Sequence, residues 1–306
     1  MRYYREIKNG DTLGGFTYKL TLNWAKWPAH LGKAKINAVA TDSKGYVYAF
    51  SRDLNDPVVV FDTDGNFVKS WGKGVFTSTH GIYISKDDIV YCSDFYAHCF
   101  YIFDLDGNQL GVIGTPGVPG DCGADLTQTN HRNRLWSAKK LGTPFCRPTK
   151  IVQGPSGDLF ASDGYANSAV HRFSADGQLK KTWGGLGIEG GELYLPHGIW
   201  VDENENVWVT DKESSRLDVF TGEGVFLKRI DWLMRPSEVA GDGKGNIYVA
   251  ELDGGVTIFN LSGHVQARFG HYLSAMRPHG ICVDHSGNIF MAQFQGNDPI
   301  VKMERL

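Results

Sequence analysis

The main pattern in the chain is a unit of apolar and polar positions that recurs six times. Each copy begins at a polar residue or a histidine, continues as an apolar strand, turns at a polar segment and returns as a second strand. Such strand-like runs around tight polar turns are typical of β-hairpins. The first and last residues of every copy are 14 positions apart, so no copy contains an insertion. The copies occupy residues 37–51, 80–94, 149–163, 197–211, 237–251 and 279–293.

A further hairpin follows each unit, most clearly at residues 58–68, 100–107 and 170–177. In these segments β-branched and aromatic residues surround a short polar turn, in each case with the dipeptide Asp-Gly, which favours a two-stranded hairpin. Two hairpins per repeat give a four-stranded blade, and a repeat of about 40 residues is typical of propellers. The sequence therefore predicts an all-β fold, a six-bladed β-propeller that forms a single domain over residues 1–306.

The last repeat lacks an outer strand, because the remaining residues 299–306 suffice for only one more strand. Near the start of the chain, residues 16–24 have the pattern of a strand that belongs to no repeat. We expect this N-terminal strand to join the last blade, which closes the ring and removes an exposed sheet edge. The longest irregular segment, residues 114–144, lies between the second and third blades and is long enough to be a functional loop.

Composition adds limits on location and partners. The net charge of −3 gives no reason to expect nucleic acid or an anionic membrane as a partner, and we expect neither. No apolar run is long enough to cross a membrane, and residues 1–8 lack the apolar core of a signal peptide. The five cysteines are odd in number and show no C-x-x-C spacing, which disfavours a disulfide framework. We therefore expect a cytoplasmic protein.

Three of the ten histidines occupy the first position of the unit. They are His80, His197 and His279, in the second, fourth and sixth copies, whereas the other copies begin with Asn37, Thr149 and Ser237. Equivalent positions of a propeller form a ring around its axis, so histidines from alternate blades converge. A single histidine at a strand start is usually structural, but three convergent imidazoles are the ligand set of a catalytic zinc. The pattern predicts a metal site, and imidazole also suits Fe, Cu and Ni.

Residues just after the unit are expected on the same face as the histidines, because the second strand returns to the end where the first began. Arg52, Tyr165 and Lys212 occupy such positions. Arg52 and Lys212 suit a clamp for a carboxylate, and Tyr165 suits proton transfer. Lys212 suits an ordinary surface charge equally well. These positions predict a small-molecule substrate that bears a carboxylate.

With these residues the sequence resembles the peptidyl-α-hydroxyglycine α-amidating lyase family, a branch of the NHL-repeat propellers. The resemblance extends over all six blades and is strongest at residues 145–149 (Phe-Cys-Arg-Pro-Thr), at 162–168 (Ser-Asp-Gly-Tyr-Ala-Asn-Ser) and in two Pro-His-Gly segments. It implies an enzyme that cleaves a carbinolamide C–N bond and releases an amide and glyoxylate. It also implies a catalytic zinc on His80, His197 and His279, a catalytic Tyr165, and substrate contact by Arg52.

The sequence departs from that family at three positions. Gly280 stands where the family has an Asp that helps to bind a structural calcium, so Ca²⁺ is doubtful here. Lys212 replaces an Arg, which keeps the charge but loses the planar two-point contact. Ala166 replaces a Cys that the family pairs with the residue matching Cys146, so that disulfide is absent. These differences favour related chemistry on a small cytosolic substrate.

The sequence thus predicts a zinc-dependent lyase of the α-amidating-lyase type. A zinc-dependent hydratase, hydrolase or epimerase remains open, because the same metal and the same carboxylate clamp suit all of them. A non-catalytic NHL-repeat binding propeller is a further alternative, because a fold does not determine a function. Three axial histidines argue against the binding propeller, which has no need of them.

Overall fold

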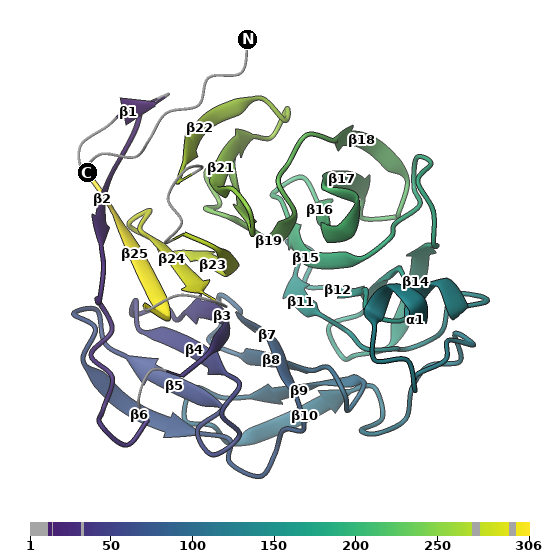
Figure 1. Ribbon diagram of the computed structural model, residues 1–306, viewed down its shortest axis with the longest axis horizontal. Helices are drawn as coiled ribbons and strands as arrows, with labels where there is room; N and C mark the ends of the chain where they lie inside the picture. Colours follow the sequence, from purple (N-terminus) through teal and green to yellow (C-terminus); the bar gives the residue numbers. More distant parts are fainter. Residues whose placement is uncertain (1–11, 14, 32–33, 271–275, 294–297) are drawn as a thin grey trace.

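The computed structural model of the protein describes residues 12–13, 15–31, 34–270, 276–293 and 298–306. Its strands form six antiparallel sheets that surround a central axis like the blades of a propeller (Figure 1). The predicted all-β, six-bladed propeller is confirmed. Each 14-residue unit forms the two inner strands of one blade, as the sequence pattern indicates.

In each of the first five blades, four consecutive strands of the chain pair side by side. The first blade contains β3 (Ile36–Thr41), β4 (Val47–Ser51), β5 (Val58–Phe61) and β6 (Phe67–Trp71), and the second contains β7 (Thr79–Ile84), β8 (Val90–Asp94), β9 (Cys99–Phe103) and β10 (Gln109–Ile113). The third contains β11 (Lys150–Gln153), β12 (Leu159–Asp163), β13 (Ala169–Phe173) and β14 (Leu179–Gly184), and the fourth contains β15 (Pro196–Val201), β16 (Asn206–Asp211), β17 (Arg216–Thr221) and β18 (Phe226–Ile230). The fifth contains β19 (Pro236–Gly241), β20 (Asn246–Glu251), β21 (Gly255–Asn260) and β22 (Val265–Phe269), and the sixth contains β23 (Pro278–Val283), β24 (Ile289–Gln293) and β25 (Ile300–Arg305).

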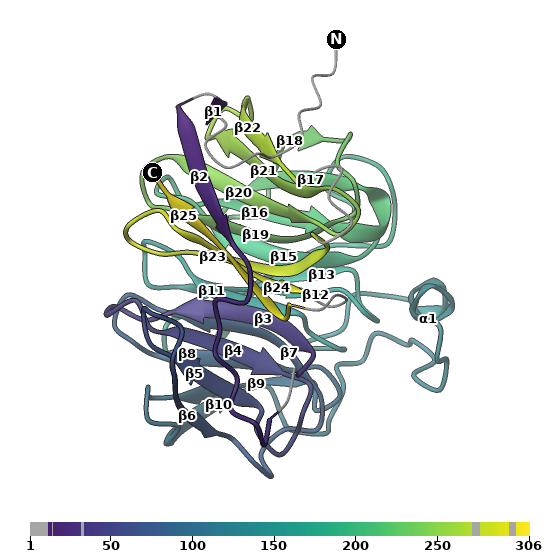
Figure 2. The same cartoon turned by 60° about the vertical axis from the view of Figure 1, so that its left-hand side comes forward.

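The N-terminal strand closes the ring, as predicted. Strand β2 (Phe16–Thr21) pairs antiparallel with β25 and supplies the outer strand of the last blade, next to the short strand β1 (Thr12–Leu13). Figure 2 shows β2 running beside β25. The strand ends at Thr21, earlier than the expected residue 24, because Asn23 takes a positive φ of 52° and turns the chain.

Apolar clusters between neighbouring blades form the core. Burial extends beyond the two inner strands: the third strand of the first blade, β5, is buried at every position and has a continuous apolar sequence, as expected of a strand covered on both faces. The turn inside each unit is fixed locally: the Asp284 carboxylate, for example, accepts the backbone N–H groups of Ser286 and Asn288 at 2.9 and 2.8 Å. Packing and turns together hold the start of the innermost strand of each blade on one face, around the axis.

The insert between the second and third blades carries the helix α1 (His131–Ser137), which projects from one face of the propeller (Figure 2). The Asn130 side chain caps the helix by accepting the backbone N–H of Arg132 at 2.9 Å. A short 3₁₀ helix, η1 (Lys212–Ser214), follows β16. No helix in the described part of the chain is long and apolar enough to cross a membrane.

Candidate metal centre

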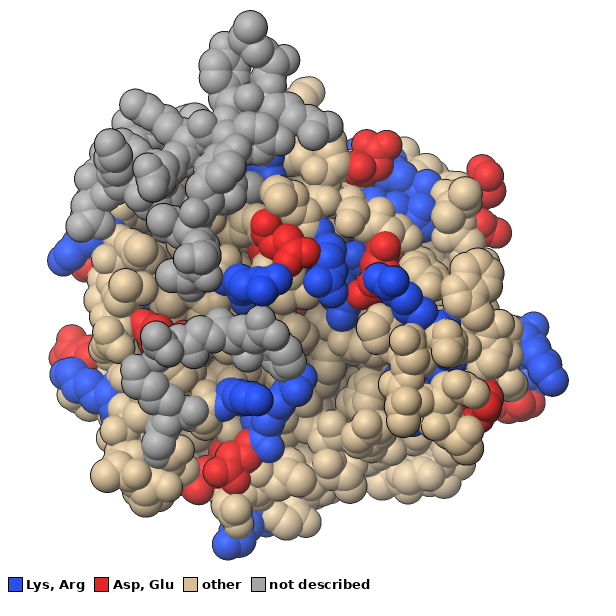
Figure 3. All heavy atoms as spheres, in the orientation of Figure 1, with Lys and Arg blue, Asp and Glu red and all other residues tan. Residues whose placement is uncertain are grey.

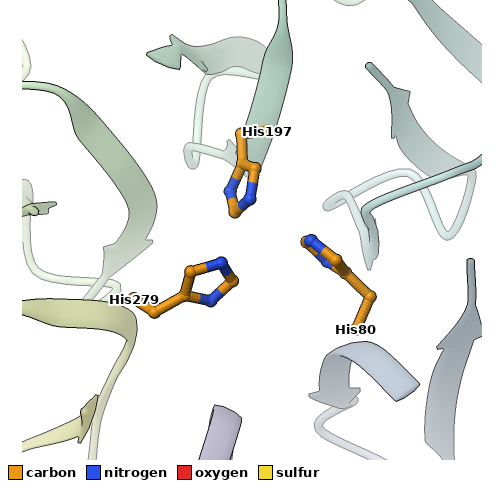
Figure 4. A group of neighbouring side chains, drawn as sticks. All are labelled: His80, His197 and His279. Carbon is orange, nitrogen blue, oxygen red and sulfur yellow. The ribbon is translucent and has the colours of Figure 1, made fainter. Parts of the chain in front are cut away.

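The three predicted histidines converge on the propeller axis. His80, His197 and His279 are the second residues of β7, β15 and β23, and their rings point toward one common centre (Figure 4). One ring nitrogen from each lies within 4.8 Å of the other two, and all three residues are buried. This is the single group of three or more possible metal ligands among the described residues.

The backbone fixes the orientation and the protonation of each ring. Nδ1 of His80 lies 3.0 Å from the carbonyl oxygen of Thr149, and Nδ1 of His197 lies 2.5 Å from that of Ser237. Nδ1 of His279 lies 2.8 Å from the carbonyl oxygen of Asn37. A carbonyl only accepts, so each Nδ1 carries the proton and donates it. Each Nε2 therefore keeps its lone pair.

In all three contacts, the histidine donates to the backbone carbonyl of the first residue of the unit in the next blade. The residues that occupy this position in the other three blades thus orient the histidine rings. Metal-bound histidines typically donate their second nitrogen in this way, which sets the tautomer and strengthens the ligand nitrogen. Nε2 of His80 is buried and has no hydrogen-bond partner among the described residues. A buried polar atom of this kind fits a metal ligand.

Burial keeps the imidazoles neutral. Loss of solvent holds the pKa of His80 and of His197 well below the ordinary value, and the positive charge of Lys212 adds to the shift. The pKa of His279 is lowered to about 3, mainly by burial and then by Lys212. Neutral imidazole is the form that binds a metal. The donor set, its protonation and its geometry all fit a transition-metal ion.

Tyr165 and Lys212 lie beside the histidines, as their positions in the repeat predict. The Lys212 ammonium donates to the Tyr165 hydroxyl at 2.9 Å, and that hydroxyl lies 3.1 Å from Nε2 of His197. Because Nδ1 of His197 carries the ring proton, the hydroxyl donates to Nε2. A metal ion bound to that nitrogen would take the place of this hydrogen bond and leave the hydroxyl beside the ion. Lys212 is only 5% exposed, so it is not the ordinary surface charge that the sequence left open.

Arg52 lies beside the metal centre, where it lines the same cavities as His80 and His279. Its Nε donates to the side-chain oxygen of Asn37 at 2.6 Å, and the amide of Asn37 in turn donates to the Thr79 carbonyl at 2.6 Å. Arg52 and Tyr165 line each of three cavities on this face, two of which also include one of the metal-site histidines. The structure therefore brings together all six residues that the sequence selected.

The site also contains residues that sequence reasoning missed. Arg235 and Arg277 line a cavity of about 230 Å³ together with Lys212 and His279, and Asp253 pairs with both arginines. Figure 3 shows Lys and Arg side chains around the middle of this face. A signal was present, because an Arg-Pro pair directly precedes the unit in the third, fifth and sixth blades. The repeat register places these arginines on the metal face.

The insert is fastened to this face by an acidic residue of η1. The Glu213 carboxylate accepts a hydrogen bond from the guanidinium of Arg132, in α1, at 2.7 Å. A carboxylate oxygen of Glu213 also lies 3.5 Å from Nε2 of His131 and 3.5 Å from a guanidinium nitrogen of Arg235. The neighbouring His131 and Arg132, together with the positive charge of Lys212, hold the pKa of Glu213 well below its usual range. The segment that follows Lys212 is thereby connected to the insert above the site.

Cys146 lies in one of the motifs on which the resemblance rests, but it contacts a different residue from the one that the family suggests. Sγ of Cys146 lies 2.8 Å from Sγ of Cys122, a residue of the insert, and both thiols are free and buried. Ala166 packs in the same small apolar cluster. The insert therefore contacts the Tyr165 loop at the place where the resemblance would put a disulfide.

The second position of the unit, one residue further along each innermost strand, is where the sequence makes calcium doubtful. Gly280 has no room for a side chain, because an added Cβ would lie 2.8 Å from Cα of Ala38. Across the axis, Nζ of Lys150 lies 3.0 Å from a carboxylate oxygen of Glu238, and both side chains are about 6% exposed. The Lys150 ammonium thus neutralises the buried Glu238 carboxylate.

We expect calcium chelation to leave the melting temperature of the protein unchanged, because Lys150 already supplies the positive charge. By contrast, Lys150→Met is expected to destabilise the fold by about 3–5 kcal/mol, the usual cost of an uncompensated buried charge. Thermal unfolding followed by circular dichroism tests both expectations. The wild-type protein is compared with and without EGTA, and the Lys150→Met variant is compared with the wild-type protein. A loss of several degrees with EGTA that added calcium restores would show that oxygen ligands elsewhere hold this ion.

Comparisons with known proteins agree with this class of fold. No family model matches the chain. NHL repeat-containing protein 3 of Homo sapiens is 29% identical over 220 residues, which cover 67% of this chain and 58% of that protein. Probable peptidyl-alpha-hydroxyglycine alpha-amidating lyase pgal-1 of Caenorhabditis elegans is 25% identical over 180 residues, or 56% of this chain and 46% of that protein. The chain spans about half the length of these curated relatives.

A solved streptogramin B lyase structure superimposes with a TM-score of 0.66 over 94% of this chain and 98% of that chain, at 14% identity. This likeness supports the propeller fold alone. The resemblance inferred from the sequence is confirmed, because the homologues include peptidyl-α-hydroxyglycine α-amidating lyases and NHL-repeat proteins. The chain is a six-bladed propeller related to lyases, with three histidines that can form a metal site on its axis.

Proposed function

We propose that the protein is a zinc-dependent lyase that cleaves the C–N bond of a carbinolamide, or a related bond, in a small substrate bearing a carboxylate. The observation that carries the proposal is the position of Tyr165. Its hydroxyl lies between the Lys212 ammonium and the His197 ligand nitrogen, within 3.1 Å of both. A hydroxyl suited to proton transfer thus borders the three imidazoles, which a binding propeller would not require.

The reaction needs one proton to move. The substrate hydroxyl loses its proton and becomes a carbonyl, the C–N bond breaks with its electron pair on nitrogen, and the nitrogen takes up a proton to give the amide. Tyr165 is placed to carry that proton, and Lys212 complements negative charge on the phenol oxygen. A metal ion on the three imidazoles would supply a Lewis acid that polarises a substrate oxygen.

The clamp for the carboxylate is assigned to Arg52, with help from Lys212. Asn37 fixes the Arg52 guanidinium, and its backbone carbonyl also fixes the ring of His279. Asn37 therefore connects the carboxylate clamp to the metal ligands. Holding the substrate in this way lowers the entropic cost of bringing its hydroxyl to the reacting groups.

We expect the zinc-loaded protein to release glyoxylate and an amide from N-acyl-α-hydroxyglycines, and the metal-free protein to release neither above the spontaneous rate. Glyoxylate can be measured by its hydrazone and the amide by mass spectrometry. Restoration of activity by zinc is the control for irreversible loss of structure. Water addition or removal without C–N cleavage would instead identify a hydratase, and absence of both turnover and bound metal would favour a binding propeller.

A further inference from the structure

One of the three cavities on this face lies beneath the insert. We call it the rim cavity; it has a volume of about 580 Å³ and is lined by Arg52, Phe95, Tyr96, Arg134, Arg147 and Tyr165, together with other residues of the insert. Because Arg52 and Tyr165 also line the cavities at the histidines, a ligand could extend from one to the other. Its volume lies within the range of small-molecule sites.

Two buried guanidinium groups line this cavity. Arg134 is only 3% exposed, and it donates to the carbonyl oxygens of Tyr165 and Gln128 at 2.8 and 2.5 Å. Arg147 is 8% exposed and donates to the carbonyl oxygen of Leu126 at 3.0 Å. Within the described part of the chain, neither arginine forms an ion pair with a carboxylate.

Arg147 is the less satisfied of the two. Its Nε is buried and has no acceptor among the described residues, and its guanidinium lies 5.2 Å from the ring centre of Phe95 and 4.9 Å from that of Tyr96. Ring faces attract a cation but do not accept the remaining N–H groups. A buried donor without an acceptor and a buried charge without a counter-charge both cost stability.

The two charges also oppose each other. The pKa of Arg134 is lowered to about 10, first by burial and then by the positive charge of Arg147, and burial lowers the pKa of Arg147 as well. Contacts with carbonyl oxygens explain how Arg134 supports the insert and the Tyr165 loop. They do not explain a second buried guanidinium beside it. An anion in the rim cavity, which both arginines line, would offset both charges.

We infer that the rim cavity binds a second carboxylate of the substrate, so that the substrate is a dicarboxylate with one acid near the reacting carbon and one at its far end. The inference rests on the proposed function for the position of the first carboxylate at Arg52. Planar guanidinium groups bind carboxylates by paired hydrogen bonds, as Arg134 and Arg147 could here. The rings of Phe95 and Tyr96 would cover the apolar spacer between the two acids.

The test uses two non-reactive probes that lack the hydroxyl, N-succinylglycine and N-pentanoylglycine, which differ in the terminal carboxylate. We expect isothermal titration calorimetry of the zinc-loaded protein to show about 10–100-fold tighter binding of N-succinylglycine, the scale of hydrogen bonds to a charged group. Arg147→Met should remove this preference, and Arg147→Lys should retain part of it. Lys19→Met, which removes an exposed positive charge on the outer strand β2, away from the insert, should keep the preference in full.

Equal binding of the two probes by the wild-type protein would overturn the inference, and this outcome depends on no variant. A preference that survives Arg147→Met in a protein with an unchanged melting temperature would overturn it too. The proposed function is tested separately with N-succinyl-α-hydroxyglycine. Selective binding without glyoxylate release would contradict the proposed lyase activity but support the second carboxylate site. Turnover of the succinyl and pentanoyl substrates with equal KM would contradict the second carboxylate site but support the lyase activity.

Discussion

Replacing His80, His197 or His279 by alanine is expected to lower the affinity for zinc by at least ~100-fold and to leave the β-sheet circular dichroism spectrum unchanged. Changes to residues that merely orient a metal ligand already cost about 10–100-fold, so loss of a ligand should cost more. The fold rests on apolar contacts between blades, which these substitutions do not alter. Metal content by plasma mass spectrometry after dialysis measures the effect.

His264→Ala is the matched control, because His264 is exposed in the turn between β21 and β22, outside the inner strands. It should keep the full metal content. If all three axial variants also retained stoichiometric metal, the axial site would be wrong, even if the protein contained zinc. If the variants lost both metal and sheet structure, the histidines would have to stabilise the fold itself, which their positions at the strand starts do not suggest.

The fold could be predicted because the repeat carries its information locally. Each unit contains its own turn chemistry, such as the Asp284 carboxylate that holds the N–H groups of Asn288 and Ser286. The spacing of 14 residues then repeats the same geometry six times. The same register predicted the convergence of three histidines and the placement of Arg52 and Lys212, because equivalent positions of a ring lie at the same height and face the same end.

Contacts between distant segments could not be predicted in this way. Arg134 belongs to an insert without any repeat, and its contact with the Tyr165 carbonyl depends on how that insert folds back. The approach of Cys122 to Cys146 arises in the same manner. The Lys150–Glu238 pair does follow the register, one position after the first residue of the unit, but it joins two blades that are not consecutive in the chain. Opposite charges at that ring position were a signal that could have been used.

Tyr165→Phe should lower kcat by about 10²–10⁴-fold while zinc stays bound, because this is the scale on which a positioned acid or base contributes. The phenol ring would keep its contacts with His80 and Phe95, at ring-centre distances of 5.3 and 4.9 Å, so the change removes mainly the hydroxyl. Steady-state glyoxylate release and metal analysis of the same sample measure the two effects. Tyr194→Phe is the control, because its hydroxyl contacts Trp136 of the insert and not the histidines.

Arg52→Ala should produce the opposite kinetic pattern, with a raised KM and a smaller change in kcat, because a carboxylate clamp binds substrate and transition state alike. Arg52→Lys should recover only part of the loss, since an ammonium lacks the planar two-point contact. The split between kcat and KM separates a group that moves a proton from one that holds the substrate. Should Tyr165→Phe and Arg52→Ala both leave turnover of a confirmed substrate unchanged, the assignment of this face as the lyase site would fail even with zinc on the three histidines.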